Sequence, residues 1–167
     1  MSAKNNNLND FPLYLFYQGK NYEAYKFFGA HSRKKGRSRV FTFRVWAPNA
    51  VSVSVVGDFN DWDRNKNPMM LISDGVWEAE IPKLKQFDIY KYSIRTRDGR
   101  TILKSDPYAS HFETRPNTAS KIYESEYQWN DSEWFTQKQE QNIYKSPVNV
   151  YEVHLGSWKV KKQDTFM

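Results

Sequence analysis

Apolar and polar residues alternate with a period of two through most of the chain after residue 39. The runs with this alternation are 40–46, 51–55, 76–81 and 90–94, and shorter strands are expected over 69–72, 101–104 and 119–123. Successive side chains of a strand point to opposite faces, so each run predicts a strand that is buried on one face. Asp74-Gly75 and Asp98-Gly99 supply turn signals between runs. Short strands separated by regular turns predict a mostly β protein with an immunoglobulin-like antiparallel sandwich over residues 39–125.

The segments on either side of this region have other patterns. Residues 1–12 are polar and rich in Asn, and we expect them to be disordered. Residues 13–38 combine an aromatic stretch without a clean period, expected to form short helical turns, with a basic loop. Residues 126–147 predict a linker with a short helix, because Asp131-Ser132-Glu133 offers an N-cap and early negative charge.

Residues 148–167 contain the most apolar strand-like run of the C-terminal part, Val148 to Leu155. A strand this apolar needs cover on both faces, as parallel strands do. Only twelve residues follow it, so the pattern predicts a protein that continues beyond Met167. Left without a neighbour, such a strand would favour self-association through its exposed backbone groups.

Composition limits the possible classes of protein. Aromatic residues make up 17% of the chain, with 6 Trp, 11 Tyr and 11 Phe, which is enough for a core and for rings on the surface. The absence of cysteine excludes disulfides and thiolate metal sites. We find no secretory signal and no stretch that could span a membrane, which predicts a cytoplasmic protein without a membrane partner.

The net charge of +6 raises the possibility of a nucleic-acid partner. The charge is concentrated between Arg33 and Arg39, where a solvated loop is a simpler interpretation than a phosphate-binding arm. The chain has no aromatic and basic recognition motif of a known type, so no nucleic-acid partner is expected.

Catalytic chemistry is not indicated. His31, His111 and His154 lie far apart in the sequence, without the spacing of a metal site, and no cofactor-binding loop is present. At strand spacing, His154 is better explained as a hydrogen-bonded core residue than as a base. No pair of carboxylates stands out for glycoside hydrolysis.

Sugar binding is the stronger hypothesis from the residues themselves. A sugar ring has apolar C–H faces and a hydroxyl rim, so its sites combine exposed aromatic rings with amides and charged groups. The turn from Gly57 to Trp62 offers both, with Asn60 as a candidate amide. The alternative is that Phe59 and Trp62 only cap the sandwich. This is the favoured interpretation for Phe59 and is left open for Trp62.

The same turn, Gly57-Asp58-Phe59-Asn60-Asp61-Trp62, resembles the signature loop of the family-48 carbohydrate-binding modules. Other motifs of that family follow in order: Arg44-Val45-Trp46-Ala47-Pro48-Asn49-Ala50, Gly75-Val76-Trp77-Glu78, Tyr90-Lys91-Tyr92, Lys104-Ser105-Asp106-Pro107-Tyr108-Ala109 and Arg115-Pro116-Asn117-Thr118-Ala119-Ser120. The resemblance implies a sandwich of the early-set type that precedes the catalytic barrel of α-glucan enzymes.

The closing octapeptide, Tyr151-Glu152-Val153-His154-Leu155-Gly156-Ser157-Trp158, resembles the first barrel strand of 1,4-α-glucan branching enzymes. Those family-13 enzymes cut α-1,4-glucan and rejoin the piece through an α-1,6 link, as in glycogen. Their catalytic carboxylates lie on later barrel strands, so the resemblance implies no catalytic residue here. The expected partners are α-1,4-glucan and the catalytic barrel.

In this family a Trp of the signature loop and a Lys of a later strand contact the sugar. The resemblance places Trp62 and Lys91 at these two positions. The β-subunit of AMP-activated protein kinase resembles this family and has a second sugar-stacking aromatic ring after the Asp-Gly turn, but residues 98–103 of this chain contain none. We therefore expect weak glucan affinity and a role in positioning the barrel. A stand-alone immunoglobulin-like module that binds protein is the alternative, although such a module has no use for a barrel strand.

Overall fold

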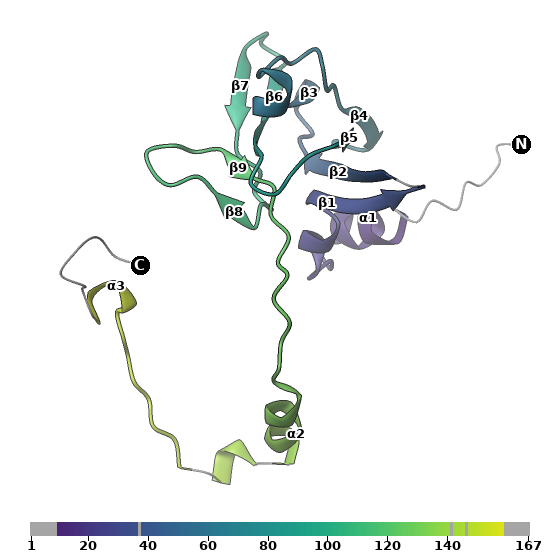
Figure 1. Cartoon of the computed structure of the whole chain (residues 1–167). Helices are drawn as coiled ribbons and strands as arrows, with labels where there is room; N and C mark the ends of the chain where they lie inside the picture. Colours follow the sequence, from purple (N-terminus) through teal and green to yellow (C-terminus); the bar gives the residue numbers. More distant parts are fainter. Residues whose placement is uncertain (1–9, 37, 141, 146, 159–167) are drawn as a thin grey trace, which may run out of the picture. The chain divides into compact units, whose positions relative to one another are not determined.

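The alternating runs form two antiparallel sheets with an apolar core between them. The structure is a computed structural model that describes residues 10–36, 38–140, 142–145 and 147–158. It divides into two compact units, Met1–Ser125 and Glu126–Met167, and both sheets belong to the first (Figure 1). The predicted mostly β, immunoglobulin-like sandwich is confirmed.

The first sheet has four strands in the order β1-β2-β5-β4. Its strands are β1 (Gly29–Lys35), β2 (Ser38–Trp46), β5 (Val76–Pro82) and β4 (Met70–Ser73). In the second sheet the order is β3-β6-β9-β8, and β7 also pairs with β6. Its strands are β3 (Ala50–Gly57), β6 (Ile89–Thr96), β9 (Ser120–Lys121), β8 (His111–Phe112) and β7 (Thr101–Lys104).

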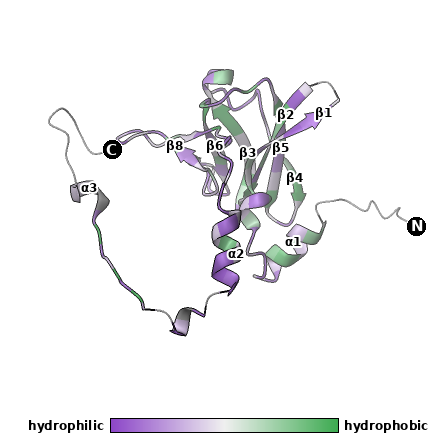
Figure 2. Cartoon of the chain, turned by 60° about the horizontal axis from the view of Figure 1, so that its bottom comes forward, coloured by the Kyte–Doolittle hydropathy of each residue, from purple (hydrophilic) through white to green (hydrophobic). Residues whose placement is uncertain are grey.

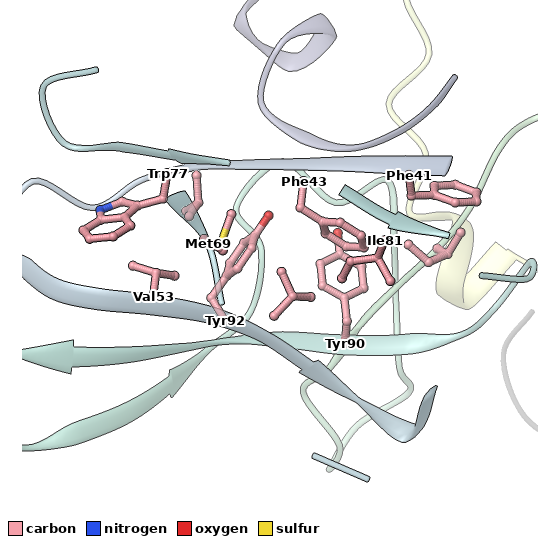
Figure 3. Close-up of a cluster of buried hydrophobic side chains, with 11 residues drawn as sticks. Phe41, Phe43, Val53, Met69, Trp77, Ile81, Tyr90 and Tyr92 are labelled. Atoms are coloured by element: carbon pink, nitrogen blue, oxygen red, sulfur yellow. The ribbon is translucent and has the colours of Figure 1, made fainter. Parts of the chain in front are cut away.

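The core lies between the sheets, where both contribute every second residue. Figure 3 shows Phe41 and Phe43 from β2 opposite Tyr90 and Tyr92 from β6. Val53 and Val55 of β3 are buried as predicted, but Val51 is 56% exposed. The register of β3 against β6 shifts between Ala50 and Ser52, and this irregularity explains why Val51 leaves the alternation.

A buried carboxylate closes one side of this core. Asp106 has no exposed surface, and its Oδ2 accepts hydrogen bonds from the hydroxyls of Tyr90 (2.8 Å) and Tyr92 (2.9 Å). Its Oδ1 accepts a bond from the Tyr108 backbone N–H. Burial raises the pKa of the Asp106 carboxyl, while these three bonds oppose the rise. Burial also raises the tyrosine pKa values, and the nearby Asp106 charge adds to that effect.

The aromatic N-terminal segment forms short helices, as predicted. These are α1 (Asp10–Tyr17) and the 3-10 helix η1 (Ala24–Lys26). Helix α1 starts within residues 1–12, the segment expected to be disordered, and residues 1–9 of that segment lie outside the described residues. Leu13 of α1 is buried with Phe28, and Phe16 packs against them. The Tyr17 hydroxyl donates a 2.7 Å bond to the Asp74 carbonyl, which ties α1 to the β4–β5 turn.

The prediction of a basic loop before the sandwich is wrong. The basic run forms a hairpin in which β1 pairs with β2 from Gly29↔Arg44 to Lys35↔Ser38, and Gly36 adopts φ +62° at the turn. Glu80 of β5 forms ion pairs with Arg33 and Lys35, the latter at 2.6 Å. Backbone pairing with β2 makes β1 an edge strand of the first sheet, and Glu80 offsets part of its charge.

The second unit contains α2 (Ser132–Glu140), the 3-10 helix η3 (Ile143–Lys145) and α3 (Leu155–Trp158). Helix α2 is the short helix that the sequence predicted in the linker. Figure 2 shows that it is mostly hydrophilic. The strand predicted over Val148–Leu155 is not formed: residues 147–154 have no regular secondary structure, and Leu155 begins a helical turn. A strand requires a hydrogen-bonded neighbour, and none of the described residues pairs with this segment.

Candidate carbohydrate-binding site

The loop after β3 is held in shape by one buried amide. It opens with the 3-10 helix η2 (Asp58–Asn60), and the Asn60 side chain is only 3% exposed. Its Oδ1 accepts the Gly57 N–H at 3.0 Å, while its Nδ2 donates to the Val55 carbonyl at 2.9 Å and to Asn67 Oδ1 at 2.7 Å. Asn60 was a candidate sugar contact, but burial and these bonds leave its amide no access to a ligand. Its role in this structure is to position the loop.

Trp62 lies on the surface in a fixed orientation. Asp61 and Trp62 both adopt left-handed backbone conformations, with φ of 57° and 58°. The Trp62 backbone N–H bonds to the Gly57 carbonyl at 3.0 Å, and its indole Nε1 donates to Asp58 Oδ1 at 2.7 Å. The ring is 38% exposed, whereas Phe59 packs against the core, as expected. Trp62 therefore presents a partly exposed ring held in place by its bond to Asp58, and an apolar ring face of this kind can stack on a sugar.

Lys91 comes from β6, next to the end of β3. The register pairs Lys91 with Val56 and Tyr90 with Gly57, the residue that anchors the Trp62 backbone. Lys91 Nζ donates to Thr118 Oγ1 at 2.7 Å. The Trp62 backbone is thus anchored at the end of β3, and Lys91 lies on the paired strand β6 near that end.

Thr118 is a polar neighbour that sequence reasoning missed as a site residue. It precedes β9, and the Ser105 hydroxyl donates to its carbonyl. The pairing of Tyr90 with Ser120 brings this segment beside Lys91. A search of the Arg115–Ser120 motif for hydroxyls beside a sheet could have found it.

The predicted turn at Asp98-Gly99 is present, and Gly99 has φ +84°. Asp98 Oδ2 accepts a 2.6 Å bond from Arg100 Nε, and hydrogen bonds from Thr96 and Arg100 lower the pKa of the Asp98 carboxyl. This turn presents polar groups instead of an aromatic ring.

Each of the three histidines has its own local contacts. His31 Nε2 lies 2.8 Å from the Phe28 carbonyl, and the His111 ring lies near Phe87 and Tyr123. Within the described part of the chain, no group of three or more His, Cys, Asp or Glu side chains could hold a metal ion. His154, expected in a core, is exposed, and its Nδ1 lies 2.9 Å from Ser157 Oγ. Among the described helices, none is long and apolar enough to cross a membrane.

A known protein family matches the part of the chain that contains this candidate site. The family described as carbohydrate-binding module 48 (isoamylase N-terminal domain) matches residues 27–109, which include β1 to β7 and both Trp62 and Lys91. Residues 27–109 belong to this family. The resemblance seen in the sequence motifs is therefore confirmed.

Curated relatives extend the match over the rest of the chain. The 1,4-alpha-glucan branching enzyme GlgB 1 of Clostridium perfringens (strain 13 / Type A) is 44% identical over 167 residues, which is 98% of this chain and 25% of the relative. The branching enzyme GlgB of Halothermothrix orenii is 48% identical over 160 residues, or 95% of this chain and 25% of the relative. The chain spans about a quarter of the length of these relatives. It corresponds to their non-catalytic N-terminal region, as predicted.

Part of the chain is also similar to solved structures of two pullulanases. A pullulanase from Bacillus acidopullulyticus is 24% identical over 58% of this chain and 12% of its own, with a TM-score of 0.47. A Klebsiella pneumoniae pullulanase complexed with maltotriose is 27% identical over 58% of this chain and 9% of its own, with a TM-score of 0.46.

Proposed function

We propose that the β-sandwich binds α-1,4-glucan weakly through Trp62 and Lys91. The observation that supports this most is the fixed, partly exposed Trp62 ring, whose Nε1 bonds to Asp58 and leaves the apolar ring available. The Lys91 ammonium and the Thr118 hydroxyl supply hydrogen-bonding groups for the rim of a sugar. Together, an apolar ring and such groups would match the apolar face and the hydroxyl rim of a glucose unit.

In the whole protein, we propose that this region positions a catalytic barrel that forms α-1,6 branches in glycogen. Exposed apolar and aromatic side chains gather in the second unit, and these include Tyr127, Trp129, Trp134, Phe135, Val148, Val150, Tyr151 and Trp158. None of its residues with a described burial is buried. Surfaces this apolar favour association with another protein surface. Residues 148–158 would form the first strand of that barrel and pair with its other strands, and self-association is the alternative when those strands are absent.

We also propose a cytoplasmic location, where branching of glycogen would take place. Cell fractionation with an antibody against the whole protein tests this location.

Replacement of the Trp62 ring tests glucan binding. Trp62→Ala removes the stacking surface, and we expect a loss of about 1–2 kcal/mol, or roughly 5- to 30-fold in affinity. Trp62→Phe keeps a ring and should retain part of the affinity. Affinity electrophoresis in gels that contain glycogen measures the change.

The control is Trp129→Ala, which removes an indole that is 77% exposed in the second unit. Circular dichroism confirms that each variant is folded. Glycogen retention by folded Trp62→Ala equal to that of the unaltered chain would refute the site. Equal losses in Trp62→Ala and Trp129→Ala would show that the effect is not local.

A further inference from the structure

A polar groove lies on the outer face of the second sheet, and glucan stacking on Trp62 does not use it. The strand register places Ser52, Arg95 and Thr101 in one row across β3, β6 and β7. Ser54 and Ser93 form the adjacent row. These residues line a groove of about 540 Å³, within the usual size range of small-molecule sites.

The segment that follows Trp62 forms one wall of this groove. Arg64, Asn65 and Pro68 line it, and Arg64 Nη1 donates to Thr101 Oγ1 at 3.2 Å. Backbone bonds from Val55 N–H to the Asn67 carbonyl (3.0 Å) and from Met69 N–H to the Val53 carbonyl (2.8 Å) hold the segment along β3. The wall is therefore attached to the sheet at several points.

The described residues that line the groove carry positive charge and include no carboxylate. Among the described residues that line it, Arg64 and Arg95 are the charged ones, and neither forms an ion pair with another described residue. Neighbouring cations on the same turns do have carboxylate partners, since Lys66 pairs with Asp61 and Arg100 with Asp98, each at 2.6 Å. Two guanidinium groups at one groove repel each other, so an anion between them would be favourable.

The lining also indicates which kind of anion fits. A guanidinium group donates two parallel bonds to phosphate oxygens, and the hydroxyls of Ser52, Ser54 and Thr101 can bond to phosphate or to sugar hydroxyls. No aromatic ring lines the groove in the described chain, so stacking of a nucleic-acid base has no support there. The Asp98-Gly99 turn, which lacks a ring, instead contributes Gly99 and then Thr101.

We propose that this groove binds the phosphate monoester of a sugar. The phosphoryl group lies between Arg64 and Arg95, and the sugar hydroxyls face the serines. The ligand is either a free sugar phosphate or a phosphorylated glucose unit within a glucan, since both present the same chemistry. The proposal goes beyond glucan stacking and does not depend on it, although Arg64 lies only two residues after Trp62.

Titration calorimetry of the full chain with glucose 6-phosphate, glucose and inorganic phosphate tests the proposal. We expect glucose 6-phosphate to bind more tightly than either of the others. Arg95→Gln should weaken it at least tenfold. The matched control is Arg97→Gln, which removes an equal charge two residues away at an exposed position that does not line the groove. Equal losses in the two variants, or equal binding of glucose and glucose 6-phosphate, would refute the groove as a site.

Two further comparisons separate the sources and the sites. Retention of the chain on amylopectin, measured before and after phosphatase treatment of the amylopectin, tests a phosphate carried by the glucan. If the treatment reduces retention and the reduction requires Arg95, the ligand is the phosphorylated glucan. If retention does not change but glucose 6-phosphate binds, the ligand is a free sugar phosphate. Trp62→Ala should still bind glucose 6-phosphate. If this variant loses only glycogen binding, the two sites are independent. If glycogen binding never depends on Trp62 while Arg95 still matters for glucose 6-phosphate, only the glucan proposal fails.

Discussion

Single residues set the geometry of the candidate glucan site, and Gly57 is the tightest of them. A Cβ built on Gly57 would lie 2.1 Å from the Ile89 carbonyl oxygen and 2.6 Å from Phe59 Cε1. The φ of Gly57 is −177°, which any residue can adopt, so the requirement for glycine comes from close approach alone. The same residue receives the Trp62 N–H at its carbonyl and gives its own N–H to Asn60.

Gly57→Ala should therefore destabilise the fold and displace Trp62. We expect a cost of about 2–4 kcal/mol, because a backbone carbonyl cannot move aside as a side chain can. Urea unfolding measures the change. The control is Gly99→Ala, where a Cβ would meet nothing within 4 Å but φ is +84°. Backbone strain there should cost about 1 kcal/mol, so a smaller effect of Gly57→Ala than of Gly99→Ala would contradict the steric explanation.

Elements with a strict period of two were predictable from the sequence. In β2, β5 and β6, Phe41, Trp77 and Tyr92 are buried where the alternation places them. The Asp74-Gly75 turn was equally clear, since Gly75 has φ +72° between β4 and β5. Such patterns are local, so a single sequence contains them.

Elements that depend on distant partners were not predictable in the same way. The basic run forms β1 by pairing with β2, and its side chains meet Glu80, more than 40 residues away, which forms ion pairs with Arg33 and Lys35. Val148–Leu155 has strand-like composition but no hydrogen-bonded neighbour in the described chain, so composition alone did not produce a strand. Asn60 was misread for a related reason: its amide type was compatible with binding sugar, but its burial follows from contacts with Val55 and Asn67.

At the scale of the whole molecule, the two units differ in how they bury apolar surface. The Met1–Ser125 unit has a continuous core between its sheets, whereas the described side chains of the second unit are exposed or partly exposed. The stability of the first unit should thus depend little on the second. The strong aromatic content of residues 126–158 is better explained by a partner surface than by a core of its own.

Deletion of residues 126–167 should leave the melting temperature of the sandwich within about 2–4 °C of the full chain, because that shift corresponds to no more than about 1 kcal/mol for a domain of this size. Self-association should decrease, since exposed aromatic residues such as Trp129 and Trp158 are removed. Differential scanning calorimetry and analytical ultracentrifugation measure the two effects. A drop of ten degrees or more would show that the second unit contributes to the core of the first.

The pair of tyrosines around Asp106 also makes the sandwich an optical reporter of its own unfolding in alkali. The pKa values of Tyr90 and Tyr92 are raised above 10.0 in the fold, mainly by burial and then by the Asp106 charge. An unfolded tyrosine ionises near pH 10, so stability is unaffected by these two groups below that pH and falls as pH rises above it. In a spectrophotometric titration, their tyrosinate absorbance should appear only together with the loss of far-ultraviolet circular dichroism. Tyr92→Phe should reduce the amplitude of that coincident step, and ionisation of Tyr90 and Tyr92 in a chain that remains folded would contradict their burial.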